Sequence, residues 1–239
     1  MSALVCGMLS LYASFRSLEG GADPDTGRLH AALFIMVAMI LDGLDGNAAR
    51  LLKATSEIGG ELDTFVDLTA FGIAPALLIY AMADGFAPGL RIGLGCALVA
   101  SGAYRLSRFK TIDPFHGQHG FTGLPITTCA AAVALFQILS IRAPESWGPL
   151  KIELGEGPFA VIFLGFVALL AILQVSRLHF PKPTKSPVIF IPAVALVILL
   201  FSDRPAVAAG SALIAIAFGL VYVFVTPFLK RAPLSESGD

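Results

Sequence analysis

Long apolar stretches alternate with short polar segments along the whole of this chain. Each stretch approaches the roughly 20 residues that an α-helix needs to cross the hydrocarbon core of a bilayer. The pattern therefore predicts an all-α fold, a polytopic membrane helix bundle with about eight transmembrane helices. The last two are separated only by Ser202-Asp203-Arg204, which predicts a tight hairpin. The expected helices cover residues 2–15, 30–52, 62–83, 90–108, 122–141, 158–176, 187–202 and 205–229.

The composition supports a membrane protein. Apolar residues make up 56% of the 239 residues and charged residues 14%, whereas a soluble domain carries roughly 25% charged residues. The mean hydropathy is +0.81. We expect a single integral membrane domain over residues 1–230 and a short polar tail over residues 231–239. The net charge of −1 gives no reason to expect a nucleic-acid partner, and the three cysteines lie in apolar runs without a metal-ligand spacing.

Lysines and arginines are distributed unevenly between the two sides of the predicted bundle. If the N-terminus is cytoplasmic, ten of the 16 fall on the cytoplasmic side and six on the other. Basic residues favour the cytoplasmic side of membrane proteins, so we expect this orientation in a cell or inner membrane. The turn between the second and third helices is then cytoplasmic. The ten residues are Arg50, Lys53, Arg105, Arg108, Lys110, Arg177, Lys182, Lys185, Lys230 and Arg231.

Four aspartates stand out because they lie within 26 residues of an otherwise apolar chain. Asp42 and Asp45 are three residues apart near the end of the second predicted helix. Asp63 and Asp67 are four residues apart at the start of the third. On an α-helix, each pair shares a face. Carboxylates at membrane depth are energetically costly, so these four indicate a functional site.

The four carboxylates are suited to holding divalent cations. In a cleft of low dielectric constant they repel one another unless a cation binds or they take up protons. Oxygen ligands select Mg²⁺, Mn²⁺ or Ca²⁺, and two such ions would neutralise four negative charges in a site suited to phosphoryl chemistry. Small residues such as Gly46 and Gly59 let a ligand approach the backbone, and Arg50 is suited to contact phosphate oxygens.

The spacing of these residues resembles the motif of the CDP-alcohol phosphotransferase family at every defined position. The pattern is Asp42-x2-Asp45-Gly46-x2-Ala49-Arg50-x8-Gly59-x3-Asp63-x3-Asp67. Eight specified residues at fixed offsets would match by chance at roughly one in 10⁹ starting positions. The resemblance implies an integral membrane enzyme that transfers a phosphatidyl or related group from a CDP-linked donor to an alcohol and releases CMP.

The resemblance also implies a role for each motif residue. Asp42, Asp45 and Asp63 would bind Mg²⁺ or Mn²⁺, as two divalent ions, on the pyrophosphate of the donor. Asp67 would complete the metal site and act as the general base. The nucleotide and phosphate groups would be bound by Gly46, Ala49, Arg50 and Gly59.

Three further segments resemble the phosphatidylserine synthases of this family, so that the resemblance covers roughly residues 30–130. It implies CDP-diacylglycerol as the donor and L-serine as the acceptor, with Arg105 and Arg108 binding the acceptor or the lipid phosphate. The same arginines also fit the topology rule alone, which leaves both interpretations open. The chain departs from this subgroup at Lys110, where an asparagine is usual. The three segments are Phe71-Gly72-Ile73-Ala74-Pro75-Ala76, Tyr104-Arg105-Leu106-Ser107-Arg108-Phe109 and Phe121-Thr122-Gly123-Leu124-Pro125.

Two other functions stay open at this point. A sister enzyme of the same family would use glycerol 3-phosphate or an inositol phosphate as acceptor, and it would need further cations near the cleft. A cation carrier would distribute polar residues over several helices, whereas the last four predicted helices carry almost no charge. The resemblance also implies a homodimer. It further implies a truncated first helix, because the chain begins at MSALVCGML without the usual N-terminal segment of the family.

Overall fold

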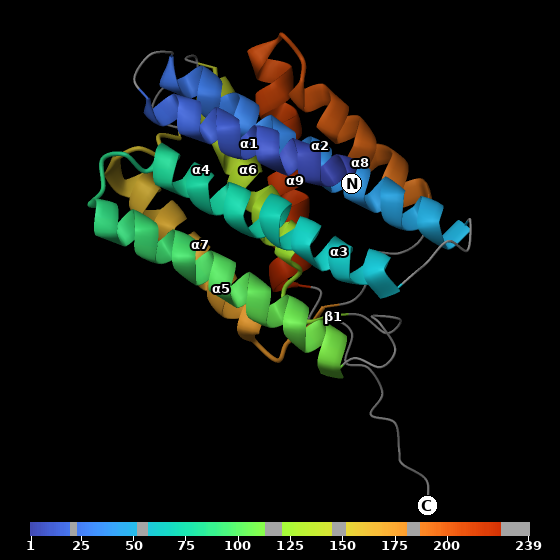
Figure 1. Cartoon of the computed structure of the whole chain (residues 1–239). Helices are drawn as coiled ribbons and strands as arrows, with labels where there is room; N and C mark the ends of the chain where they lie inside the picture. The colour runs from blue at the N-terminus through green and yellow to red at the C-terminus, as the bar shows by residue number, and fades with distance from the viewer. Residues whose placement is uncertain (20–22, 52–56, 113–120, 145–151, 181–186, 226–239) are drawn as a thin grey trace, which may run out of the picture.

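The structure is a computed structural model of the chain, and it describes residues 1–19, 23–51, 57–112, 121–144, 152–180 and 187–225. This part of the chain is mostly helical and forms one bundle (Figure 1). A π-helical segment, η1 (Leu68–Ile73), joins α3 to α4 without a break, and two short strands, β1 (Phe121–Thr122) and β2 (His179–Phe180), pair in antiparallel orientation. The α-helices are α1 (Ser2–Leu18), α2 (Pro24–Leu51), α3 (Glu57–Asp67), α4 (Ala74–Met82), α5 (Pro88–Ile112), α6 (Ile126–Arg142), α7 (Gly157–Val175), α8 (Pro187–Leu200) and α9 (Pro205–Phe224).

Each of the eight predicted helices corresponds to a helical run of the structure, with α3, η1 and α4 together forming the third. The boundaries differ most at α2, which begins at Pro24 because Asp23 caps it. Asp23 Oδ2 accepts hydrogen bonds from the Thr26 backbone N–H (3.2 Å) and the Thr26 hydroxyl (2.7 Å). An acceptor side chain followed by proline is a common start of a helix. The predicted tight hairpin is confirmed as the short turn between α8 and α9.

Four helical runs among the described residues are long and apolar enough to cross a membrane. Two of the other helices, α1 and α6, are shorter but also apolar. These observations support the prediction of a helical membrane protein, while the number of eight crossings stays a prediction. The four runs are Pro24–Gly46, Ile58–Met82, Gly157–Val175 and Pro205–Phe224.

Small side chains allow α1 to pack closely on α2 and η1. A Cβ atom added to Gly7 would lie 2.9 Å from Ala70 Cα, and one added to Gly27 would lie 2.8 Å from Ser17 Cβ. Small residues at helix contacts are typical of membrane proteins, where backbones can then approach closely. This packing holds the start of α1 beside the C-terminal half of α2. The buried residues of α1 are Ala3, Gly7, Ser10, Ala13, Ser14 and Ser17.

The π-helical segment η1 begins directly after Asp67. Its wider hydrogen-bond pattern is visible at its end, where the Ala74 backbone N–H donates to the Thr69 carbonyl oxygen five residues earlier. Phe71 and Gly72 are buried in this segment, which contacts α1, α5 and α6. π-Helical segments are rare and often occur at functional sites. Here the segment connects the last motif aspartate to the core of the bundle.

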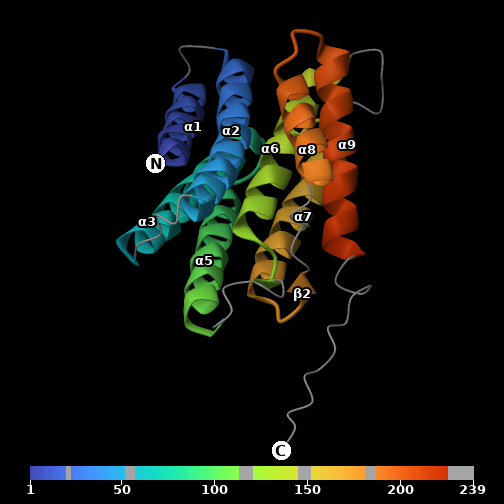
Figure 2. The ribbon, with the colours of Figure 1, turned by 90° about the vertical axis from the view of Figure 1, so that its right-hand side faces the viewer.

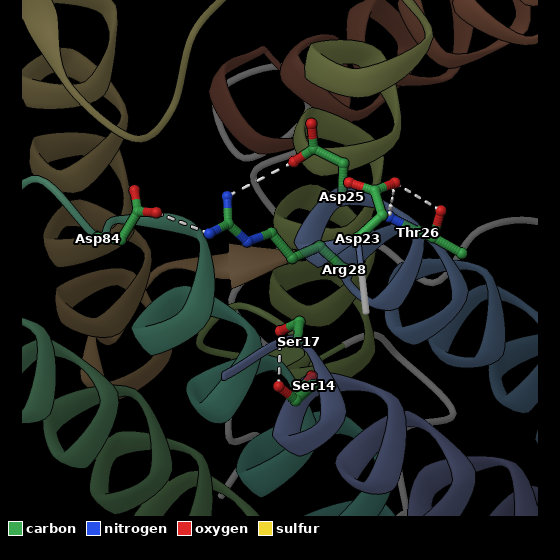
Figure 3. A network of polar contacts seen from close by, with 7 residues as sticks. All are labelled: Ser14, Ser17, Asp23, Asp25, Thr26, Arg28 and Asp84. Carbon is green, nitrogen blue, oxygen red and sulfur yellow. Dashed lines mark hydrogen bonds and ion pairs between the residues drawn. The ribbon is translucent and has the colours of Figure 1, made fainter. Parts of the chain in front are cut away.

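The antiparallel order of the helices divides the charged residues between two ends of the bundle (Figure 2). One end, which we call the carboxylate end, carries Asp42, Asp45, Asp63 and Asp67. The other, which we call the opposite end, carries the turns that join α1 to α2 and α4 to α5. There Arg28 lies between two acidic side chains, with Nη2 2.7 Å from Asp84 Oδ2 and Nη1 3.6 Å from Asp25 Oδ1 (Figure 3).

Candidate active site

Asp42 and Asp45 both line a cleft at the carboxylate end, as expected for two residues on one face of α2. The Asp45 carboxylate is contacted from α1: its Oδ2 atom accepts a hydrogen bond from Ser2 Oγ (2.9 Å) and lies 3.2 Å from the Met1 ammonium nitrogen. Asp42 is half-buried and has no such partner among the described residues. The two carboxylates of this pair therefore differ, because only Asp45 is held by hydrogen-bond donors from the part of the chain that the structure describes.

Asp63 and Asp67 lie one turn apart on α3, and Asp67 is the last residue of that helix. Asp63 is exposed. Asp67 is half-buried, and its Oδ1 atom is fully buried without a hydrogen-bond partner in the described part of the chain. A buried polar atom without a partner destabilises a protein by about 1–3 kcal/mol unless a ligand supplies one. The negative charges of Asp42 and Asp63 lie close enough to act on Asp67.

The cleft has a volume of about 210 Å³ and lies where α1, α2 and α3 meet. Three of the four predicted metal ligands line it, and Asp67 lies deeper, one helical turn beyond Asp63. The sequence prediction that α2 and α3 bring the two carboxylate pairs to one place agrees with this arrangement. The lining residues are Met1, Ala3, Asp42, Asp45, Gly59, Leu62, Asp63 and Val66.

The carboxylates fit a divalent cation by their chemistry. Hard oxygen donors are what Mg²⁺ and Mn²⁺ take in proteins, and the buried Oδ1 atom of Asp67 is a donor that lacks a partner among the described residues. In the described part of the chain, no three His, Cys, Asp or Glu side chains converge closely enough to hold an ion. Asp45 contributes to this, because its carboxylate is directed toward Met1 and Ser2. The predicted pair of ions stays a prediction.

The predicted nucleotide-binding residues lie beside this cleft to different extents. Gly59 lines it, and Gly46 is a half-buried residue of α2 one position after Asp45. Ala49 and Arg50 lie on the last turns of α2, but their side chains are outside the described residues. Gly60 shows that there is free space here, since a Cβ atom added to it would meet no heavy atom within 4 Å.

Arg105 is a buried cation on α5 beside the carboxylates. Only 6% of its surface is exposed, and its charge acts on Asp67. Its guanidinium carbon lies 6.0 Å from the centre of the Phe109 ring. A buried guanidinium requires an anionic or carbonyl partner. The position beside Asp67 is compatible with the predicted role in binding an anionic group.

Arg108, one turn further along α5, donates to backbone carbonyl oxygens. Its Nη2 atom lies 2.6 Å from the Thr122 oxygen and 2.9 Å from the Ser176 oxygen, and its Nη1 atom lies 3.1 Å from the Val175 oxygen. It thereby joins α5 to β1 and to the C-terminal end of α7, where a positive charge is favourable. Gly123 lies against this group with φ +81°, and a Cβ atom there would overlap the Gln174 carbonyl oxygen. These contacts favour a structural role for Arg108, and its predicted role in substrate binding stays untested.

An ion pair that the sequence reading did not identify joins α3 to α5 at the same end. Lys110 Nζ lies 2.8 Å from Glu61 Oε1, and both side chains are accessible, at 32% and 68% of their surface. Glu61 stands two residues before Asp63. Lys110 occupies a position where the phosphatidylserine synthases that this chain resembles usually have asparagine. The unusual residue at position 110 was a signal in the sequence that could have drawn attention to this pair. Nothing in the sequence indicated which acidic residue Lys110 contacts.

The fold and the site define a class of protein: an apolar helical bundle with a carboxylate-lined cleft at one end, as expected of a membrane enzyme that acts on a phosphate-containing substrate. The sequence model of the CDP-alcohol phosphatidyltransferase family matches residues 1–172. The chain therefore belongs to the CDP-alcohol phosphatidyltransferase family.

Several named proteins are similar in sequence to this chain. The CDP-diacylglycerol–serine O-phosphatidyltransferase of Helicobacter pylori strain J99 is 37% identical over 154 residues, which is 64% of this chain and 60% of that protein. The protein of the same name from Bacillus subtilis strain 168 is 32% identical over 180 residues, 74% of this chain and 84% of the relative. The archaetidylserine synthase of Methanothermobacter thermautotrophicus is 30% identical over 160 residues, which is 65% of this chain and 60% of that protein. The match thus spans about three fifths of the Helicobacter relative.

Proposed function

We propose that this protein transfers the phosphatidyl group of CDP-diacylglycerol to the hydroxyl group of L-serine, forming phosphatidylserine and CMP. The observation that carries the proposal is the buried oxygen of Asp67, which has no partner among the described residues and lies next to a cleft lined by Asp42, Asp45 and Asp63. A carboxylate in this position can accept a proton and lies beside groups suited to a pyrophosphate-bound metal. The names of the Helicobacter and Bacillus relatives support serine as the acceptor.

At phosphorus, the reaction forms one P–O bond and breaks another. The serine hydroxyl oxygen attacks the phosphorus atom that carries diacylglycerol, and the bond from that phosphorus to the oxygen of the CMP phosphate breaks. CMP leaves with the bonding electron pair, and Asp67 takes the hydroxyl proton. Two divalent ions, Mg²⁺ or Mn²⁺, would supply charge neutralisation at the pyrophosphate. Asp42, Asp45, Asp63 and Asp67 would hold them.

The remaining motif residues would bind the donor. Gly46 and Gly59 lack side chains, so the nucleotide could approach the backbone of α2 and α3 closely, and we assign Ala49 and Arg50 to the same nucleotide and phosphate site. Of the two arginines on α5, we assign Arg105 to an anionic oxygen of the donor or acceptor, because it is buried beside Asp67. The hydrogen bonds of Arg108 to three carbonyl oxygens support an indirect role for that residue.

We further propose that residues 1–230 form a single domain that crosses the membrane eight times and places the carboxylate end on the cytoplasmic face. The excess of lysine and arginine on this side supports the orientation. A cytoplasmic cleft can receive CDP-diacylglycerol from the membrane and serine from solution. We also propose a homodimer, on the family resemblance alone. The polar tail at residues 231–239 lies outside the described residues.

An acceptor panel tests the proposed function. The purified protein in mixed micelles with CDP-diacylglycerol and Mn²⁺ is given L-serine, glycerol 3-phosphate or inositol phosphate, and CMP release is measured. We expect release with L-serine, together with labelled phosphatidylserine. Release with a phosphorylated acceptor alone would identify a sister enzyme instead. Transport of cations into vesicles without any CMP release would overturn the assignment as an enzyme.

A further inference from the structure

We propose that Glu61 and Lys110 form the binding subsite for the ammonium and carboxylate groups of an α-amino-acid acceptor, with Glu61 taking the ammonium group and Lys110 the carboxylate. The inference rests on the proposed function, because it names the residues that would distinguish serine from other alcohols. It starts from the 2.8 Å ion pair between Lys110 Nζ and Glu61 Oε1.

The pair lies at a place where two site-bearing helices separate. α5 packs along η1, whereas the main helix contacts of α3 are with α1 and η1. Figure 2 shows α3 leaning away from α5 toward the carboxylate end. Long side chains bridge the two helices there, and both are accessible. An exposed ion pair of this kind stabilises a protein by only about 0–1 kcal/mol. A ligand can therefore separate the two charges at little cost.

Helix geometry gives an axial separation between this pair and the proposed base that is similar to the length of a bound serine. Glu61 precedes Asp67 by six residues, about 9 Å along the helix axis at 1.5 Å per residue. On α5, Lys110 follows Arg105 by five residues, about 7.5 Å. Serine spans about 3–4 Å from its hydroxyl oxygen to its carboxylate carbon. With a hydrogen bond of about 2.8 Å at each end, the total is about 9 Å. A serine hydroxyl at Asp67 would thus place the amino-acid head group at the Glu61–Lys110 pair.

The charges also match the acceptor in sign. The pair offers one anion and one cation, which complements a zwitterion and complements neither a neutral alcohol nor a phosphorylated one. Glu61 would repel the phosphate of glycerol 3-phosphate. In this arrangement Lys110 binds the serine carboxylate, and Arg105, whose charge acts on Asp67, would contact the lipid phosphate of the donor. Lys110, which stands where asparagine is usual, would then have a function in this chain.

Single substitutions test each half of the subsite. We expect Lys110→Gln and Glu61→Gln each to raise the serine KM by about tenfold or more, the value of one charged hydrogen bond. The kcat and the KM for CDP-diacylglycerol stay near those of the unmodified protein. Lys110→Gln loses the preference for serine over ethanolamine, which lacks the carboxylate. Glu61→Gln loses the preference for serine over 3-hydroxypropanoate, which lacks the ammonium group. Arg16→Gln, which removes an exposed ion pair with Glu19, is the matched control and leaves all three values unchanged.

Exchange of the two charges separates recognition from a structural role. The variant Glu61→Lys with Lys110→Glu keeps an ion pair between α3 and α5 but inverts its direction. Because the hydroxyl group is fixed at Asp67, exchanging the ammonium and carboxylate positions on the serine Cα corresponds to the opposite enantiomer. We expect the ratio of D-serine to L-serine turnover to rise by about tenfold or more.

Two results would overturn the inference. One is a serine KM unchanged in both single variants, and the other is an exchanged variant that recovers L-serine turnover with an unaltered D to L ratio. If the unmodified protein released CMP only with an acceptor other than serine, the proposed function itself would fail. The acceptor panel on the unmodified protein therefore distinguishes the two failures.

Discussion

The two ends of the bundle differ in how most of their aspartates are paired. At the opposite end, Arg28 lies between Asp25 and Asp84, and Arg91 donates to the Tyr80 carbonyl oxygen over 3.0 Å with its guanidinium carbon 4.4 Å from the centre of the Tyr80 ring. At the carboxylate end, Asp42 and Asp63 lack partners in the described part of the chain, as does the buried Oδ1 atom of Asp67.

We infer from this difference that the partnered aspartates of the opposite end are structural and that Asp42, Asp63 and Asp67 bind a ligand. Charges that stabilise a fold are satisfied within the protein, and Asp23 at the opposite end is an example. The hydrogen bond from the Thr26 hydroxyl holds the pKa of the Asp23 carboxyl group below its usual range. Carboxylates that repel one another and lack donors destabilise the fold, so their presence indicates a ligand that compensates them. The predictions below test this contrast.

The largest effect is expected at the cleft. We expect Asp42→Asn and Asp63→Asn each to lower serine-dependent CMP release by at least about 100-fold, because a metal ligand is lost. The melting temperature of the metal-free protein should stay the same or rise, because repulsion among the carboxylates is relieved. CMP release and thermal unfolding without metal measure the two quantities. Asp25→Asn at the opposite end is the control and should keep its activity. A cleft variant that stays active contradicts the assignment.

Two glycines with positive φ provide a matched test of packing at the two ends. Gly123 (φ +81°) faces the Gln174 carbonyl oxygen and Arg108, whereas Gly157 (φ +85°) has free space around it. We expect Gly123→Ala to lower the free energy of unfolding by about 3 kcal/mol, from backbone strain and overlap together. Gly157→Ala should lower the free energy of unfolding by only about 1 kcal/mol, from backbone strain alone. Denaturant or thermal unfolding measures both, and equal losses would show that the contact with Arg108 and Gln174 contributes nothing.

A smaller effect is expected when the paired charges of the opposite end are broken. Arg28→Gln removes the partner of Asp84 and Asp25, both of which are partly accessible to solvent. We expect a loss of about 1 kcal/mol in the free energy of unfolding. The kcat for CMP release should be unchanged below the melting temperature, since the proposed active site lies at the other end. A fall in kcat with intact folding would show that the two ends are coupled.

The smallest effect concerns the cap of α2. The lowered pKa of Asp23 means that its ionised form stabilises the fold above the usual aspartate pKa of about 4, and that this contribution is lost as the pH falls through the lower folded value. Asp23→Asn keeps an acceptor for the Thr26 hydroxyl but lacks the charge. We expect the variant to melt slightly below the unmodified protein at neutral pH, with the difference disappearing under acidic conditions. A difference independent of pH would exclude the charge as its source.

Much of the fold follows from hydropathy alone, because a bilayer requires long apolar helices. The eight helical runs and the hairpin between α8 and α9 were predicted correctly. The N-terminal extension of α2 was not, because Asp23 and Pro24 lie in a polar segment. The π-helical segment and the pairing of β1 with β2 depend on tertiary contacts. They have no local pattern that identifies them.

The placement of the carboxylates was predictable where spacing determines it. Residues three or four apart on a helix share a face, so the two aspartate pairs could be placed without a structure. Among the described residues, Asp45 has hydrogen-bond donors, whereas Asp42 and Asp63 have none. This difference depends on α1, which is distant in sequence and supplies the donors to Asp45. The same holds for Arg108 and Lys110. Both were predicted on the cytoplasmic side, but their contacts with α7 and α3 come from tertiary packing.

The most direct test compares one aspartate from each end. Serine-dependent CMP release is measured with CDP-diacylglycerol and Mn²⁺ for the unmodified protein, Asp67→Asn and Asp84→Asn. We predict that Asp67→Asn loses about 10²- to 10⁴-fold in kcat, as expected for removal of a general base, while it still binds CDP-diacylglycerol. Asp84→Asn should keep its kcat. Full activity in Asp67→Asn, or an equal loss in both variants, would contradict the assignment of the carboxylate end as the active site.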